Sequence, residues 1–236
     1  MLTNEPVTTP DEAKALICEL GRRFYDLGWV SGTGGGIALC FDECVFMAAS
    51  GVQKEALREG DIYELDLEGS VVAGPDEARG LCVSACRPLF LAAMRMRDAG
   101  AVIHSHSKHA MLTTLVCRDA FRVTHLEMMK GLAGVGYHDF HEVPIIENTA
   151  HEEDLADSLS AAIEAWPKAH GVLVRRHGLY VWGKDWREAK RHAECYDYLF
   201  EAALEMRRLG VDPDALPERE DGDTDELPVL SLGSRR

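Results

Sequence analysis

The chain has 236 residues, of which 46% are hydrophobic and 28% charged, and its formal net charge is −15 at pH 7. This length suffices for one large domain or two small ones with a substantial core, and the composition is ordinary for a soluble globular protein. Such an acidic surface repels phosphate backbones, so we expect no nucleic-acid partner. It does not exclude a small phosphorylated ligand, because local backbone amides can bind one.

The cysteines and the N-terminal sequence indicate an intracellular setting. The chain has seven cysteines, an odd number, and no Cys-x-x-Cys pair. Residues 1–6 contain neither a basic region nor an apolar stretch, so we expect no signal peptide and no membrane span. Reduced thiols in a cytoplasmic protein are the natural interpretation.

The first predicted elements are a helix and two strand pairs. Thr9 can cap a helix that carries Pro10 in its first turn and ends at Gly28. Residues 31–36 follow, and they contain too many glycines for a regular element. Short apolar runs then predict antiparallel pairs formed by residues 37–40 with 44–48 and by 62–67 with 70–73.

The second half of the chain alternates helices with strands. We predict helices over residues 88–97, 108–116, 151–166 and 186–209, and strands over 101–106, 143–147 and 171–175. Acidic residues in the first turn of the 151–166 helix match the positive end of the helix dipole. The last helix is the longest, and its apolar stripe consists of Ala189, Ala193, Tyr196, Leu199, Phe200 and Ala203.

This order of elements predicts an α/β fold. We expect three layers, α/β/α, around a central sheet that is mixed but mainly antiparallel. Residues 1–210 form a single domain in this interpretation. Residues 211–236 combine three prolines with many acidic groups, so we expect an acidic, partly flexible C-terminal tail.

The most informative feature is the pair His104 and His106, which follows the apolar run 101–103. Because side chains alternate along a strand, both imidazoles are expected on one face, where they can bind one cation. His177 follows another apolar, strand-like run. Three histidines with an open fourth position are typical of a catalytic zinc. The alternative is a pair of surface or hydrogen-bonded histidines.

Two turns of small residues could bind an anion. Gly35 and Gly36 end a glycine run that follows a helix and precedes a strand, so this run is neither a dinucleotide fingerprint nor a Walker loop. Ser50 and Gly51 close the next strand. Glycines let backbone amides approach a phosphate closely, and the two turns together predict a phosphate cradle. The alternative for the glycine run is a flexible linker.

Two further residues need the sequence around them to be interpreted. Cys86 precedes Pro88 and therefore lies near the N-terminus of a helix, where a thiol pKa is lowered and a cysteine can be reactive. The alternative is a small buried hydrophobe. Glu127 lies between two apolar residues, and nothing in its own pattern singles it out.

Seven segments in combination resemble the class II aldolase family, which has a zinc-dependent, adducin-like fold. They occur in the family's order and extend from about residue 10 to residue 216. Within the family the chain is most similar to the dehydratases. The segments are SGTGGGI (31–37), SGVQKE (50–55), AVIHSHSK (101–108), THLEMMKG (124–131), VPIIENT (143–149), VLVRRHGLYVWG (172–183) and ECYDYLF (194–200).

The resemblance implies roles by matching position. The zinc ligands of the family fall on His104, His106 and His177. The acid/base residue of the dehydratases falls on Glu127, and their substrate-contacting cysteine falls on Cys86. The phosphate-binding turns match Gly35, Gly36, Ser50 and Gly51, with Ser84 as a weaker phosphate candidate.

One departure from the family bears on the reaction. Aldolases and epimerases of this fold carry a glutamate preceded by two serines, where this chain has Ser84-Ala85-Cys86. The resemblance therefore implies zinc-dependent dehydration of a small phosphorylated ketose, by a homotetramer with sites near its subunit interfaces. Two alternatives remain open. One is a class II sugar-phosphate aldolase or epimerase, and the other is a non-catalytic, adducin-like interaction protein.

Overall fold

The computed structural model describes residues 5–217. Helix α1 (Pro10–Asp26) begins as predicted, because the Thr9 side chain accepts the backbone N–H of Glu12 at 3.2 Å. Just after this helix, Gly28 has a φ of +72°, a backbone conformation that glycine adopts without strain and that stops a helix. The N-terminal helix predicted from the sequence is therefore confirmed.

Nine strands within residues 5–217 form one sheet in the order β4-β3-β2-β1-β5-β9-β8-β7-β6. The contacts between neighbouring strands are antiparallel, except that β7 and β8 run parallel. The predicted mixed, mainly antiparallel sheet is confirmed. The strands are β1 (Gly36–Phe41), β2 (Cys44–Ala48), β3 (Ile62–Asp66), β4 (Val71–Ala73), β5 (Ala101–Ser105), β6 (Ala120–Thr124), β7 (Phe140–Ile146), β8 (Gly171–Val174) and β9 (Gly178–Gly183).

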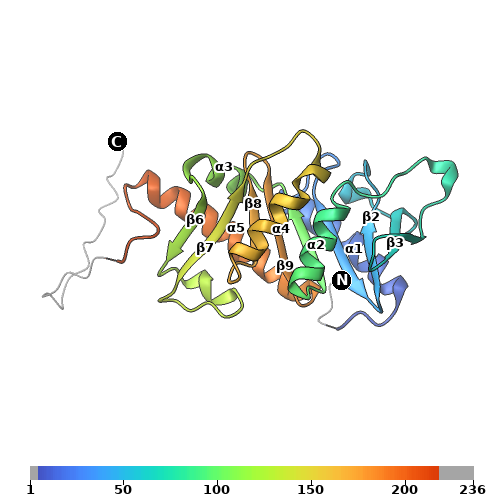
Figure 1. The fold of residues 1–236 in the computed structure, drawn as a ribbon, viewed down its shortest axis with the longest axis horizontal. Helices are drawn as coiled ribbons and strands as arrows, with labels where there is room; N and C mark the ends of the chain where they lie inside the picture. The colour runs from blue at the N-terminus through green and yellow to red at the C-terminus, as the bar shows by residue number, and fades with distance from the viewer. Residues whose placement is uncertain (1–4, 218–236) are drawn as a thin grey trace, which may run out of the picture.

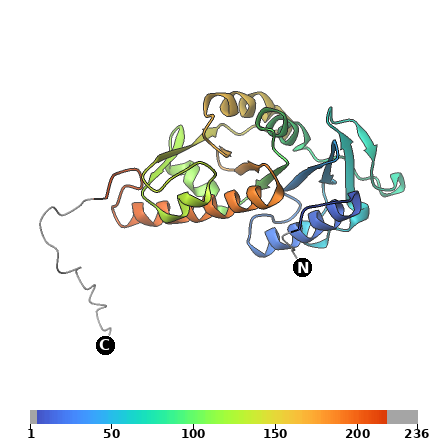
Figure 2. The ribbon, with the colours of Figure 1, turned by 90° about the horizontal axis from the view of Figure 1, so that it is seen from below.

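Helices cover both faces of this sheet. The remaining α-helices are α2 (Arg87–Arg97), α3 (Lys108–Val116), α4 (Ala156–Ala165) and α5 (Trp186–Arg208). Helices α1 and α5 lie on one face and α2 and α4 on the other, as Figure 2 shows edge-on, and each face has its own hydrophobic cluster. The three predicted layers are confirmed, and Figure 1 shows β2 and β3 at one end of the molecule and β6 and β7 at the other.

Two strands and several short helices differ from the sequence prediction. Strand β9 was not predicted, although it is buried throughout and lies at the centre of the sheet. Strand β6 was missed as well. The helix predicted over 151–166 begins instead as a 3₁₀ turn and ends at Ala165. In the described part of the chain the 3₁₀ helices are η1 (Lys54–Ala56), η2 (Glu59–Asp61), η3 (Glu77–Arg79), η4 (Glu127–Gly131) and η5 (Glu152–Leu155).

The C-terminal part of the described chain folds back onto the domain. The predicted apolar stripe of α5 is buried at every one of its six positions. Beyond α5, the N–H of Thr124 in β6 donates to the carbonyl of Pro213 at 3.1 Å, so the start of the predicted tail is ordered. The rest of that tail, residues 218–236, lies outside the described residues. Between residues 5 and 217, no helix has both the length and the apolar character needed to span a bilayer.

A cluster of buried histidines supports the α5 face of the sheet. The hydroxyl of Tyr196 accepts the backbone N–H of His170 at 3.0 Å and lies 2.9 Å from Nε2 of His141. Burial lowers the pKa of His141 to about 4, and the neighbouring His170 and His192 add to this effect. Burial likewise lowers the pKa of His192 to about 4. Both imidazoles are therefore neutral in the folded protein near pH 7.

This cluster predicts that stability falls below about pH 6.5. The unfolded chain protonates a histidine with a pKa of about 6.5, whereas folded His141 does so near 4. Between these values the unfolded state holds more protons, so the free energy of unfolding decreases as the pH falls. Urea unfolding of the metal-free protein between pH 7.5 and 4.5 should show this decrease, and His141→Gln should make it smaller. An equal slope in the variant and the wild type would contradict the assignment.

Candidate metal centre

The structure brings the three predicted histidines together at the middle of the sheet. His104 lies on β5, and His177 lies in the turn between β8 and β9. The Nε2 atom of His104 is 2.8 Å from that of His106 and 3.2 Å from that of His177, and the last two are 3.1 Å apart. Nitrogens that bind one tetrahedral zinc lie about 3.3 Å apart, because Zn–N bonds are ~2.0–2.1 Å long. The arrangement therefore fits a metal ion.

The route by which His106 reaches the centre differs from the prediction. Strand β5 ends at Ser105, so His106 lies beyond the strand and not on its alternating face. Its backbone N–H donates to the carbonyl of Trp29 at 2.7 Å. The imidazole of His106 is therefore positioned by a contact to the loop after α1. The alternation of side chains along a strand does not position it.

Hydrogen bonds at the far side of two rings set their tautomers. Nδ1 of His104 lies 3.2 Å from the carbonyl oxygen of Leu179, and Nδ1 of His177 lies 3.2 Å from Oδ1 of Asn148. Both oxygens can only accept, so each Nδ1 carries the proton. The Nε2 atoms then present lone pairs to the centre, which is the state that binds a metal.

Burial keeps two of the histidines, His106 and His177, neutral. Burial lowers the pKa of His106 to about 3, and His104 and His177 reinforce the shift. Burial also lowers the pKa of His177 to about 4. Neutral imidazoles need no deprotonation before they bind a cation, so the centre is ready for a metal near pH 7.

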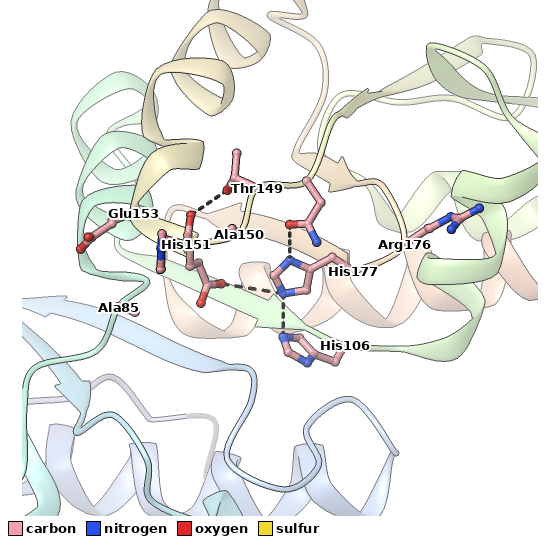
Figure 3. A pocket seen from close by; sticks show the side chains of 10 residues that line it. Ala85, His106, Thr149, Ala150, His151, Glu153, Arg176 and His177 are labelled. Carbon is pink, nitrogen blue, oxygen red and sulfur yellow. Dashed lines mark hydrogen bonds and ion pairs between the residues drawn. The ribbon is translucent and has the colours of Figure 1, made fainter.

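The histidines open onto a pocket of about 640 Å³. Figure 3 shows His106 and His177 side by side, and Arg176 lies in the turn that carries His177. Residues 148–153 and Ala85 complete the lining of the pocket. A metal at the histidines would therefore be accessible to a small molecule.

A carboxylate that sequence reasoning missed also enters the centre. Oε1 of Glu152 lies 3.0 Å from Nε2 of His104 and 3.9 Å from Nε2 of His177, and it accepts the hydroxyl of Tyr180. In the sequence, Glu152 is one of three consecutive acidic residues that suit a helix N-terminus equally well. No signal in the pattern distinguishes it, because the 3₁₀ turn of η5 decides which side chain points inward.

Cys86 and Ser84 lie beside this carboxylate. The Sγ atom of Cys86 lies within 4.8 Å of ligand atoms of His104 and Glu152. Cys86 caps α2 as predicted, and its N–H donates to Oγ of Ser84 at 3.2 Å. The expected lowering of its thiol pKa is wrong, because burial, followed by the charge of Glu152, raises that pKa to about 12.

The two predicted phosphate turns are joined by a lysine that the sequence analysis did not single out. Lys54 is buried, and its Nζ donates to the carbonyls of Thr33 and Val52, both at 2.8 Å. These carbonyls belong to the glycine run that contains Gly35 and to the turn that begins at Ser50. Burial lowers the pKa of Lys54. The glycine run is thus held in place and is not a free linker.

The glycine run also packs directly against the metal centre. A Cβ atom on Gly34 would lie 2.6 Å from Cε1 and 2.7 Å from Nδ1 of His106. Gly35 has a φ of +71°, and Gly36 pairs with His104 across β1 and β5. On the other side, the N–H of Ser50 donates to the carbonyl of Cys82 at 2.8 Å, which connects the second turn to the Ser84 segment. The glycine run therefore lies against the centre, and the second turn is joined to the segment that leads to Ser84.

Glu127 is placed differently from the other candidates. It begins η4, and its side chain is 74% exposed and pairs with Lys130 at 2.9 Å. Among the described residues that line the pocket, Glu127 is absent. The structure of one chain therefore does not bring Glu127 to the histidines.

Residues 15–204 match the Class II Aldolase and Adducin N-terminal domain family. The chain belongs to this family. Among solved structures, an L-fuculose 1-phosphate aldolase has the same fold, with a TM-score of 0.72, 20% identity, and coverage of 92% of this chain and 94% of that one.

Curated members of this class II aldolase and adducin family include dehydratases. The methylthioribulose-1-phosphate dehydratase of Xenopus tropicalis is 46% identical over 228 residues, which cover 93% of this chain and 95% of that protein. A "probable methylthioribulose-1-phosphate dehydratase" of Dictyostelium discoideum is 48% identical over 215 residues, covering 88% and 93%. The resemblance to the dehydratases of the family is thereby confirmed.

The contact between the glycine run and His106 predicts that Gly34→Ala weakens metal binding. The new methyl group must displace the imidazole, since the two would overlap at 2.6 Å. Competition with a chelator should show metal affinity at least about tenfold lower, the scale seen when metal ligands lose their support. Gly60→Ala is the control, because the backbone there is not left-handed and a Cβ would meet no atom closer than 4.0 Å. Equal affinities of the two variants would refute the positioning role of Gly34.

Proposed function

We propose that the chain is a zinc-dependent hydro-lyase that converts 5-methylthioribulose 1-phosphate into 2,3-diketo-5-methylthiopentyl 1-phosphate, a step of the methionine salvage pathway in the cytoplasm. The observation that carries the proposal is the convergence of His104, His106 and His177 at a pocket, in a chain 46% identical over 228 residues to a curated dehydratase of this substrate. The three nitrogen donors suit zinc, which favours imidazole ligands.

The reaction removes water across C3 and C4 of the ketose. The C3–H proton leaves, its electron pair forms the C3=C4 double bond, and the C4 hydroxyl departs with a proton as water. The resulting enol tautomerises to the 2,3-diketone. The difficult step is removal of a carbon-bound proton next to the C2 ketone. Zinc held by the histidines supplies Lewis-acid polarisation of this carbonyl.

Residues of the chain hold the substrate and move the protons. A positioned carboxylate accelerates proton transfer by ~10²–10⁴-fold, and we assign this role to Glu127. Cys86 orients the substrate beside the histidines, since its thiol lies next to His104 and Glu152. The turns at Gly35–Gly36 and Ser50–Gly51, with Ser84, bind the phosphate and set the position of the carbon chain.

Glu127 can fulfil this role from a neighbouring subunit. Its side chain is 74% exposed on η4, so it is available to the site of another copy of the chain. We therefore propose a homotetramer, the assembly implied by the family resemblance, in which Glu127 of one subunit completes the pocket of the next.

The identity of residue 86, a cysteine in this chain, distinguishes the proposed dehydration from aldolase chemistry. The aldolases of the family carry a glutamate at this position, whereas Cys86 here is buried and presents a protonated thiol. The likeness to the L-fuculose 1-phosphate aldolase, at 20% identity, reflects the fold and not the reaction. An interaction role alone would not require three histidines that converge beside an open pocket.

Turnover of 5-methylthioribulose 1-phosphate by the zinc-loaded protein tests the proposed function. We expect release of the diketone, loss of activity on dialysis against a chelator, and recovery when zinc is returned. The phosphate-containing products should be identified by mass spectrometry. Cleavage of the carbon chain into two fragments would instead show an aldolase, and absence of any turnover would favour the interaction protein.

Mixing two inactive variants tests the shared site. Glu127→Gln should retain metal and fold but lose most turnover, and His106→Ala should lose metal. If a site combines residues of two subunits, refolding an equal mixture should restore about a quarter of the wild-type rate, because random assembly pairs two intact halves that often. No recovery, with each variant folded and assembled, would place Glu127 in the same subunit's site or outside the site.

A further inference from the structure

Glu152 is the described carboxylate that contacts the three-histidine centre, and the proposed reaction gives it no role. It lies at the start of η5 and lines the same pocket as His106 and His177. Its Oε1 atom contacts two imidazoles, at 3.0 Å from His104 and 3.9 Å from His177. These separations are those of groups that share one ion, since ligand atoms of a tetrahedral zinc lie about 3.3 Å apart.

The Nδ1 protons of His104 and His177 point away from Glu152. The Nδ1–H of His104 donates to Leu179 and that of His177 donates to Asn148, which leaves both Nε2 atoms as acceptors. An anionic oxygen and two nitrogen lone pairs therefore face one another. Such a group of acceptors is unfavourable by itself, and a divalent cation between them turns each repulsion into an attraction.

Other groups hold the carboxylate in this position. The Tyr180 hydroxyl donates to Oε1 of Glu152, and the Cys86 thiol forms a further hydrogen bond to the carboxylate. Tyr180 is fully buried on β9, and its ring stacks on that of His104 with centroids 4.0 Å apart. The carboxylate is thus anchored to the same rigid strands that carry the histidines. This is the kind of outer support found behind metal ligands.

We propose that Glu152 is a fourth protein ligand of the metal, so that the centre contains three histidines and one carboxylate. The proposal rests on the metal centre of the proposed function. Cys86, at the start of α2, supports this carboxylate as a hydrogen-bond donor. Zinc can expand to five ligands, which leaves a position for substrate.

Metal binding by Glu152→Gln tests this ligand, with Glu153→Gln as the matched control. Glu153 precedes the same helix, lines the same pocket and is exposed, so its loss changes the net charge equally without removing a contact to the histidines. Cobalt(II) is the probe, because its visible absorption bands report the number and type of ligands. Chelator competition gives the affinity, and circular dichroism with thermal unfolding of the metal-free proteins checks the fold. Glu152→Asp is the second variant if the first does not fold.

We expect Glu152→Gln to bind cobalt at least about tenfold more weakly than the wild type and to change the positions and intensities of the visible bands. Glu153→Gln should retain the wild-type affinity and spectrum. If Glu152→Gln also retains both while His106→Ala loses them, Glu152 is not a ligand and the three-histidine centre of the proposed function stands. If the wild type binds neither cobalt nor zinc, both proposals are wrong.

Discussion

The site depends on one constraint, the close approach of three imidazole nitrogens, an arrangement that a shared cation stabilises. Their Nε2 atoms lie 2.8–3.2 Å apart. The sheet enforces this approach, because β5 lies between β1 and β9, with Gly36 and Tyr180 on either side of His104. The fully buried residues of these strands, such as Ile103 and Val181, stabilise the arrangement. Each large apolar side chain contributes roughly 1.5–3 kcal/mol by its burial, which offsets the cost of bringing the imidazole nitrogens close together.

The surroundings of the centre are organised by neutral acceptors and one buried lysine. Backbone and amide oxygens hold the Nδ1 protons of His104 and His177, so the lone pairs face inward. Lys54 ties the glycine run to the Ser50 turn, and Gly34 leaves room for His106. Pre-organisation of this kind lowers the cost of binding a metal and an anionic substrate together.

The described chain contains a half-complete site. Two of the metal-binding candidates, His106 and His177, line one pocket, whereas Glu127 projects from the surface at η4. The proposed shared site reconciles these positions, because an exposed carboxylate on one subunit can close the pocket of another. In this proposal Glu152 binds the metal, whereas Glu127 transfers protons.

The sequence by itself determined the layers of the fold, the helix capped by Thr9, the buried stripe of α5 and the three histidines. These features depend on local periodicity and on the chemistry of the residue types, and both can be read from the amino-acid sequence. The position of β9 at the centre of the sheet became evident only in the tertiary structure. In the sequence its apolar run merges with the segment 172–183 that also contains His177. Tertiary packing also buries Cys86, which raises the pKa of its thiol, and it places Lys54 between the two turns. It directs Glu152 into the centre while the neighbouring acidic side chains face solvent. Those outcomes depend on which segments meet in space, and no spacing along the chain contains that information.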